Sequence, residues 1–545
     1  MAVESGQDDK KEDLKAPEKA EVASFRDDGD TSEETFYIDL RPRLIRLPKF
    51  DDKKDINIRY PVIPPFAFVH IYWSEEDMEI MYEIEEPLLS ETEKEILNLI
   101  QLGLEEMINV SFVRASKYNL IIKYLEKNVQ SILIELGARI SKKSYQKIMY
   151  YIYRDSVGLN EIEPMLKDYY IEDIECNGTG FPIYIVHRVY ENLRTNVLFT
   201  DGQKHMDFIE KMAQKCSRYV SFAKPLLDGT LPDGSRVNAT YTDDITTRGP
   251  TFTIRKFTKD PWTPAHLIKS GTACADLYAF IWMAIEEKFS MMVVGETASG
   301  KTTFLNSVVN FMPPEARICS IEDTRELNLA HLNWLPAVSR EGFGIPNLMG
   351  DMYGEVSLFA LLKESFRQNP DYVIVGEVRG KEAFVLFQGM ASGHPSYGTF
   401  HAGSVETLMR RLQTPPISIS PALCETLDLV AICVHIKHGE KGVRRVRELA
   451  EIKKSYEDGS VDYNPVFSWD PITDKIVFNG NSVIIKKLAT KIGKTEEQLL
   501  DEIAKRSALL QTITDKNIMD FKDFSRVIHS FFKDSDVVYK QFGIK

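Results

Sequence analysis

No run of about eighteen apolar residues occurs in the 545-residue sequence, and no apolar stretch follows a basic N-terminus. The first absence argues against a membrane-spanning helix and the second against a secretory signal. Cysteine pairs of the form C-x-x-C are also missing, because the six cysteines stand far apart. Isolated thiols are typical of a reducing compartment, so we expect a cytoplasmic protein.

An excess of basic residues is missing as well. The net charge is −14, whereas a dedicated nucleic-acid binder needs a basic surface to neutralise phosphates. The acidity is concentrated in residues 1–35, which hold twelve Asp or Glu and five Lys or Arg. The apolar side chains of this segment are too few for their burial to offset the entropy cost of ordering the backbone. We therefore expect a disordered acidic tail. The tail either keeps the protein in solution or docks a partner.

The hydrophobic pattern divides the rest of the chain into four segments. Residues 36–160 mix short strands with longer helices, so a mixed, mainly helical segment is expected there. Residues 161–260 hold Asn-Gly and Asp-Gly turns between short strands, which predicts an α+β domain. In residues 261–480 short apolar strands alternate with amphipathic helices, which predicts a parallel sheet with helices on both faces. Residues 481–545 show helical spacing and predict a small helical cap.

The stretch GETASGKT matches the phosphate-loop pattern G-x-x-x-x-G-K-[ST] between an apolar strand and a helix. Its glycines let backbone N–H groups turn toward a β-phosphate, and the helix N-terminus adds partial positive charge. The lysine reaches the β- and γ-phosphates, and the first threonine hydroxyl can ligate Mg²⁺. The predicted nucleotide-binding residues are Gly295, Glu296, Thr297, Ala298, Ser299, Gly300, Lys301, Thr302 and Thr303.

Acidic residues follow two other predicted strands. Glu377 comes after the apolar stretch YVIV and a glycine, and Glu322 and Asp323 end the stretch CSIED. Beside one nucleotide, two such carboxylates can divide the work: one holds the metal shell and the other activates the attacking water. The pattern leaves open which of Glu322 and Glu377 is the base.

Two histidines, His394 and His401, lie seven positions apart in SGHPSYGTFHAGS. No Cys, Asp or Glu between them could complete a zinc site. Phosphoryl transfer needs positioning and charge, so a hydrogen-bonding role fits better than a covalent one. We predict a sensor loop in which His401 contacts the γ-phosphate and His394 steadies the loop or a subunit contact. The simpler alternative is two histidines satisfied by the backbone.

Four segments occur in the order of the Walker A, Asp, Walker B and His boxes of the secretion ATPase superfamily: GETASGKTT, SIEDTREL, RQNPDYVIVGEVRG and ASGHPSYGTFHAGS. The chain therefore resembles this superfamily, which covers type II and type IV secretion ATPases, type IV pilus motors and the archaellum motor. The resemblance implies an α/β fold with a RecA-like P-loop ATPase domain, preceded by an α+β N-terminal domain and a helical segment. It also implies a homohexamer that uses Mg²⁺ with ATP as substrate and acts on a polytopic membrane platform protein, at the inner face of the cell membrane.

The resemblance also implies residue roles. Lys301, Thr302 and Thr303 take the Walker A roles. Glu377 matches the Walker B glutamate, with Thr302 and Glu377 near Mg²⁺, and Glu322 matches the glutamate expected to activate water. His394 and His401 match the His-box histidines. Arg236 and Arg255 match arginines that the N-terminal domain brings to the phosphates.

One departure from the family is informative. Bacterial type II members usually carry a zinc module of paired C-x-x-C motifs, and none exists here, so no zinc is expected and the archaeal branch is the more similar. We predict a hexameric ATPase that powers assembly of a type IV pilus-like filament, an archaellum or a type II-like secretion machine. The motifs do not choose between these machines, nor between extension and retraction.

Two alternatives come from other functional classes. A RecA-like nucleic-acid translocase is disfavoured by the acidic charge, so no nucleic acid is expected as partner. A nucleotide-binding scaffold without turnover is disfavoured by the intact Lys301, Thr302, Glu322 and Glu377.

Overall fold

The computed structural model describes residues 36–107, 118–257, 261–340, 352–438 and 441–544, together with residue 342 and except positions 41, 43, 44, 46, 49 and 51. The acidic tail expected over residues 1–35 lies outside the described residues. The chain forms two compact units, one ending at Lys256 and the other beginning at Phe257. The hydrophobic pattern predicts this boundary four residues later, between residues 260 and 261, and predicts a further division of each unit.

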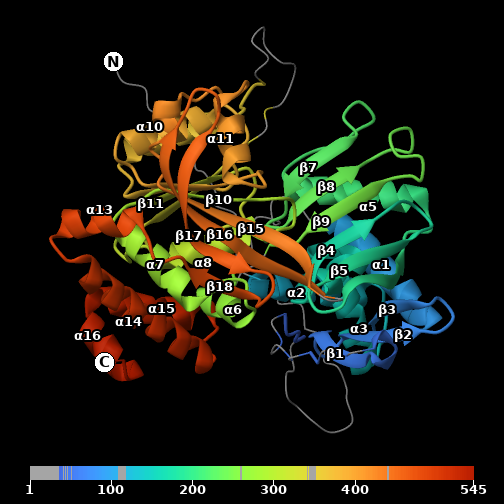
Figure 1. The fold of residues 1–545 in the computed structure, drawn as a ribbon. Helices are drawn as coiled ribbons and strands as arrows, with labels where there is room; N and C mark the ends of the chain where they lie inside the picture. The colour runs from blue at the N-terminus through green and yellow to red at the C-terminus, as the bar shows by residue number, and fades with distance from the viewer. Residues whose placement is uncertain are drawn as a thin grey trace, which may run out of the picture. The chain divides into compact units, whose positions relative to one another are not determined.

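The first unit is built on a nine-stranded sheet with the order β1-β2-β3-β6-β5-β4-β9-β8-β7 among the described residues (Figure 1). Its strands are β1 (Asn57–Ile63), β2 (Ala67–Ser74), β3 (Glu79–Glu85), β4 (Ile171–Cys176), β5 (Pro182–His187), β6 (Glu191–Leu198), β7 (Leu226–Thr230), β8 (Arg236–Thr240) and β9 (Thr251–Arg255). Its helices are α1 (Glu91–Met107), α2 (Tyr118–Glu135), α3 (Lys142–Ile152), α4 (Glu163–Lys167) and α5 (Gly202–Lys215).

The turn signals in the first unit produce the hairpins they predict. β4 pairs antiparallel with β5, and β7 pairs antiparallel with β8. A contact between distant parts of the sequence was not predicted: β3 pairs in parallel with β6 through Met81 and Tyr82. Residues 36–160 and 161–260, which were expected as separate segments, therefore share one sheet.

The second unit contains another nine-stranded sheet within the described ranges, with the order β12-β11-β13-β14-β10-β15-β16-β17-β18. Its strands are β10 (Met291–Gly295), β11 (Ile318–Glu322), β12 (Trp334–Val338), β13 (Tyr372–Val375), β14 (Ser396–Phe400), β15 (Leu429–His438), β16 (Lys441–Ser455), β17 (Val461–Asp470) and β18 (Lys475–Phe478). The first six strands in chain order are parallel, as predicted. From β15 onward the strands are antiparallel, because short turns join them and leave no room for a crossover.

Helices cover both faces of this sheet, as predicted. Met291 and Val293 of β10 lie in one apolar core, and the alternate residues Met292 and Val294 lie in the other. The first core includes residues of α6 (Pro264–Lys269), α7 (Ala275–Glu286), α8 (Lys301–Val308) and the C-terminal helices α13 (Val483–Ile492), α14 (Glu496–Asp515), α15 (Phe521–Lys533) and α16 (Ser535–Phe542). The second includes residues of α9 (Leu358–Ser365), α10 (Glu382–Ala391), α11 (Val405–Gln413) and α12 (Pro421–Cys424). None of the described helices is long and apolar enough to cross a membrane.

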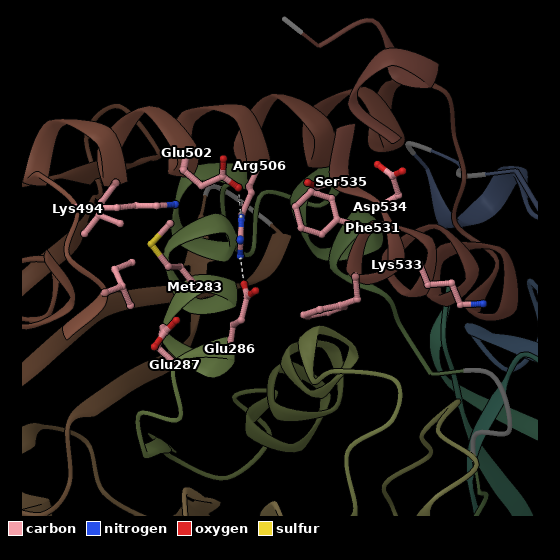
Figure 2. A pocket seen from close by; sticks show the side chains of 13 residues that line it. Met283, Glu286, Glu287, Lys494, Glu502, Arg506, Phe531, Lys533, Asp534 and Ser535 are labelled. Carbon is pink, nitrogen blue, oxygen red and sulfur yellow. Dashed lines mark hydrogen bonds and ion pairs between the residues drawn. The ribbon is translucent and has the colours of Figure 1, made fainter. Parts of the chain in front are cut away.

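The C-terminal helices are fastened to α7 by a buried arginine. Arg506 of α14 lies 2.7 Å from a Glu286 carboxylate oxygen and 3.0 Å from one of Glu502. Figure 2 draws both ion pairs as dashed lines. Its guanidinium also lies 4.9 Å from the ring centre of Trp282 and 5.1 Å from that of Phe531. Arg506, both glutamates and Phe531 border a cavity of about 510 Å³ whose lining includes none of the predicted nucleotide-binding residues. The cavity therefore belongs to the junction between α7 and the cap.

Replacing Arg506 with alanine is expected to lower the free energy of unfolding by about 2–3 kcal/mol. The change removes two stacking contacts and leaves two carboxylates unpaired, although their side chains are still 34% and 27% exposed. The urea-unfolding midpoint measures the effect. Arg526→Ala is the matched control, because the Arg526 side chain is 74% exposed beside Asp523, and its removal should cost less than about 0.5 kcal/mol. Equal midpoints for the two variants would contradict the anchoring role.

Candidate functional site

The predicted phosphate loop forms a tight turn between β10 and α8. Gly295 has no room for a side chain, because an added Cβ would lie 2.3 Å from the Cys433 carbonyl oxygen. Gly300 caps α8 with φ +88°, a left-handed conformation that favours glycine. Inside the turn, the Ser299 hydroxyl donates to the Glu296 carbonyl oxygen over 2.8 Å. The loop therefore has the shape that the sequence pattern requires at a helix N-terminus.

Lys301 begins α8, and its side chain turns back over the loop. The residue is 8% exposed, and its ammonium donates to the Glu296 carbonyl oxygen over 2.8 Å. The same nitrogen lies 3.3 Å from Nδ1 of His401. Burial lowers the pKa of Lys301 from its ordinary value. In the first turn of α8, Thr302 is half-buried and Thr303 is exposed.

His401 connects this lysine to the acidic end of β13. Its Nε2 lies 3.1 Å from an oxygen of Glu377, whose other oxygen accepts a hydrogen bond from Arg379. Burial alone would raise the pKa of Glu377, but the hydrogen bond from Arg379 and the neighbouring positive charges hold it below its ordinary value. Burial, followed by the positive charge of Lys301, lowers the pKa of His401. Glu377 is therefore an ionised carboxylate in a cationic setting.

Glu322, at the end of β11, has the opposite environment. It is 1% exposed, and one carboxylate oxygen accepts the backbone N–H groups of Glu326 and Leu327, each over 2.9 Å. The other oxygen, Oε2, is buried and has no hydrogen-bond partner within the described part of the chain. Burial raises the pKa of Glu322 to about 7. A Cβ on Gly376 would lie 2.9 Å from the Glu322 side chain, so the ends of β11 and β13 approach closely.

The prediction that His394 and His401 share one loop is wrong. The residues SYGTF between them form β14, a fully buried strand, so the histidines lie at its opposite ends, roughly 20 Å apart. The aromatic and hydroxyl side chains of SYGTF favour a buried strand over a loop. The His394 ring packs edge-on against Phe366 with centroids 5.2 Å apart, and its backbone N–H donates to the Gly389 carbonyl. Of the two histidines, only His401 contacts the phosphate loop, through Lys301.

Arg236 and Arg255 belong to the first unit, where they are direct cross-strand partners on β8 and β9. Arg236 forms an ion pair with Asp228 at 3.0 Å, and Arg255 forms one with Asp173 at 3.3 Å. The Arg255 side chain is 68% exposed. The sheet therefore brings the two arginines together, and their contact with a nucleotide stays a prediction.

Two residues beside the site were not predicted from the sequence. Arg379 hydrogen-bonds Glu377 and lies 3.7 Å from an oxygen of Asp323, so it bridges the acidic ends of β13 and β11. Arg411 of α11 donates to the carbonyl oxygen of His401. The position of Arg379, two residues after the Walker B glutamate, was an available signal for the first. Arg411 lies ten residues from its partner and offers no local signal.

The donor set suits Mg²⁺. This ion prefers oxygen ligands, keeps several waters and usually takes only one or two carboxylates together with substrate phosphates. Such oxygens are present on the half-buried Thr302 next to the loop lysine, on the ionised Glu377 linked to that lysine through His401, and on the unpartnered Oε2 of Glu322 beside Gly376. Over the described ranges, no group of three or more His, Cys, Asp or Glu side chains could hold a metal ion alone. A metal here would depend on a bound nucleotide for further ligands.

Comparison with known proteins gives consistent relatives. The family model described as Type II/IV secretion system protein matches residues 157–476. An uncharacterized protein of Methanocaldococcus jannaschii is 33% identical over 510 residues, which cover 88% of this chain and 89% of that protein. The type IV secretion system protein PtlH of Bordetella pertussis is 29% identical over 272 residues, which cover 44% of this chain and 78% of that protein. The solved structure of the Legionella pneumophila ATPase DotB has a TM-score of 0.38 at 16% identity, covering 67% of this chain and 93% of that chain.

The family model spans more than half of the chain, and the first relative spans nearly all of it. The predicted resemblance, including its archaeal leaning, is confirmed by these matches. The chain therefore belongs to the type II/IV secretion system protein family, and the phosphate loop with its acidic neighbours makes it an ATPase of that family.

Proposed function

We propose that this ATPase is a homohexameric motor that hydrolyses ATP with Mg²⁺ to power assembly of a type IV pilus-like filament, an archaellum or a type II-like secretion machine. One observation carries the enzymatic part of the proposal. Lys301, His401 and Glu377 form a contiguous chain of contacts from the phosphate loop to the end of β13. Beside it, the ends of β11 and β13 place Glu322 next to Gly376 and Glu377. This arrangement supports the proposed hydrolysis of a γ-phosphate, which needs a lysine on the phosphates and acidic groups for metal and water.

The proposed mechanism assigns each group a task. The loop N–H groups and the start of α8 hold the phosphates, and Lys301 exchanges the Glu296 carbonyl for phosphate oxygens. Thr302 and Glu377 would hold Mg²⁺, which when bound offsets charge on the phosphates. Glu322 accepts a proton from the attacking water, because its buried carboxylate has a pKa near neutrality. His401 exchanges the contact of its Nε2 with Glu377 for a hydrogen bond that it donates to the γ-phosphate.

Family membership supports the contacts and partners proposed next. Arg236 and Arg255 bring the first unit to the phosphates, so that hydrolysis alters how this unit is held. The motor acts at the inner face of the cell membrane on a polytopic platform protein. A nucleic-acid partner is disfavoured, because the chain carries a net charge of −14.

Hydrolysis by the purified full-length chain tests the proposal. We expect turnover that stops when Mg²⁺ is removed, that is unchanged by single-stranded DNA, and that accompanies a hexamer in light scattering with ATP. Arg236→Ala and Arg255→Ala should each slow turnover by about 10²-fold, because each removes a charged donor from the phosphates. Arg59→Ala is the matched control, since Arg59 forms an ion pair with Glu85 in the same sheet.

The possible results are distinguishable. Stimulation by DNA would favour a translocase, and nucleotide binding without turnover would favour a scaffold. Normal rates in both arginine variants would make Arg236 and Arg255 structural.

A further inference from the structure

A single strand contacts both loops that surround the expected phosphates. The Arg444 side chain of β16 donates from Nε to the carbonyl oxygen of Ala298, in the phosphate loop, over 3.0 Å. The Arg447 side chain of the same strand donates from Nη2 to the carbonyl oxygen of Gly403, two residues after His401, over 2.8 Å. The two arginines therefore hold the backbone of both loops from one element.

The strand geometry explains how β16 reaches both loops. Arg444 pairs with His435 of β15, whereas Arg447 is the extra residue of a β-bulge, because Cys433 pairs with Val446 and Ile432 pairs with Glu448. Between the two arginines, Val446 packs in the core that contains Phe304 of α8, whereas Val405 of α11 lies in the core on the other face. The phosphate loop leads into α8, and the turn after His401 leads into α11. Arg444 thus contacts the loop that leads into α8, and Arg447, at the bulge, contacts the turn that leads into α11.

Each contact fixes a loop atom that matters for phosphate binding. A P-loop must point its N–H groups inward, so its carbonyl groups point outward and need donors. Arg444 supplies such a donor to the carbonyl oxygen of Ala298. A Cβ added at Gly300 would lie 3.2 Å from Cδ of Arg444, so the arginine packs closely over the loop. Arg447 acts on the turn that carries His401, and Arg411 binds the carbonyl oxygen of His401 itself.

We propose that Arg444 and Arg447 are positioning residues of β16, and that each holds the backbone of one loop in its binding conformation independently of the other. Arg444 sets the phosphate loop for the β-phosphate, which ADP and ATP share. Arg447 sets the turn that presents His401 to the γ-phosphate, which ATP alone carries. The proposal rests on the proposed ATPase function of this site.

Binding of MgADP and of the non-hydrolysable analogue MgAMP-PNP to the full chain, measured by calorimetry, tests this assignment. Arg444→Ala should weaken both nucleotides about tenfold, because it removes one charged hydrogen bond to the shared loop. Arg447→Ala should weaken MgAMP-PNP about tenfold, leave MgADP within about twofold, and lower kcat. Lys453→Ala, which removes another cation of β16 beside Asp462, should bind both nucleotides as the unaltered chain does.

Lysine replacements distinguish loss of the hydrogen-bond donor from misfolding of the alanine variants. Arg444→Lys and Arg447→Lys keep a donor and should recover most of the lost affinity. Unchanged binding in both alanine variants, or an equal loss of both nucleotides in Arg447→Ala, would overturn the proposal. The unaltered chain is assayed for ATP hydrolysis in parallel. If it does not hydrolyse ATP, the proposed function is overturned, whatever the variants bind.

Discussion

Replacing Lys301 with alanine is expected to reduce ATP turnover at least ~10³-fold. The reason is local: this ammonium begins α8 and turns over the loop where the β- and γ-phosphates are expected to bind. No other described side chain in the loop is cationic. The fold should survive, because within the described part of the chain Lys301 forms no ion pair and only contacts the Glu296 carbonyl oxygen and the His401 ring. Steady-state phosphate release measures the rate, and circular dichroism with a thermal melt checks the fold.

Lys288→Ala is the control for the loss of a lysine in the same unit. Lys288 is half-exposed and forms a surface ion pair with Asp371 at 3.4 Å, so its removal should leave the rate unchanged. A rate near that of the unaltered chain in Lys301→Ala would remove Lys301 from the site.

Replacing Glu322 with glutamine is expected to slow hydrolysis by about 10³-fold without loss of nucleotide binding. The amide oxygen can still accept the backbone N–H groups of Glu326 and Leu327, so the turn after β11 is retained. An amide cannot accept a proton from water at neutral pH, which removes the proposed base. Single-turnover hydrolysis together with an ATP-binding assay separates the two effects.

The pH dependence gives Glu322 a second signature. A base must be unprotonated to act, and burial raises the pKa of Glu322 to about 7. In the unaltered chain, kcat/KM should therefore rise as pH increases through about 7, since this parameter reports groups of the free enzyme. The rise should vanish in Glu322→Gln.

Glu377→Gln is the contrasting variant. Glu377 has a lowered pKa and is ionised throughout that range, so Glu377→Gln should keep the pH-dependent rise, bind nucleotide, hydrolyse it slowly and need more Mg²⁺. If the rise persisted in Glu322→Gln and vanished in Glu377→Gln, the roles of base and metal ligand would be exchanged.

Much of this site could be predicted because its signals are local. The phosphate loop needs glycines at Gly295 and Gly300 and a lysine next, and these constraints act within eight residues. The proximity of Glu322 and Glu377 could also be predicted, because parallel strands end at one edge of a sheet and bring their last side chains together. The hairpins of the first unit depended on turn residues alone.

The remaining features depend on contacts between distant residues. The change to antiparallel pairing after β15 depends on where each strand finds a partner, and an apolar run does not reveal that direction. Arg411, Arg444 and Arg447 bind backbone carbonyl oxygens, and any residue type offers such an oxygen, so their partners leave no mark in the sequence. The division of roles between Glu322 and Glu377 depends on burial and on Arg379, which only the fold defines.

The parallel pairing of β3 with β6 has a mechanical consequence. It makes the nine strands of the first unit one continuous plate, with Arg236 and Arg255 near one end and β1 at the other. Seven strand spacings separate β8 from β1, a span of about 34 Å. If Arg236 and Arg255 contact the nucleotide as proposed, a tilt of about 10° at these residues would move the far edge of such a span by about 6 Å. The sheet would then work as a lever arm that turns the loss of one phosphate into a displacement of several ångströms.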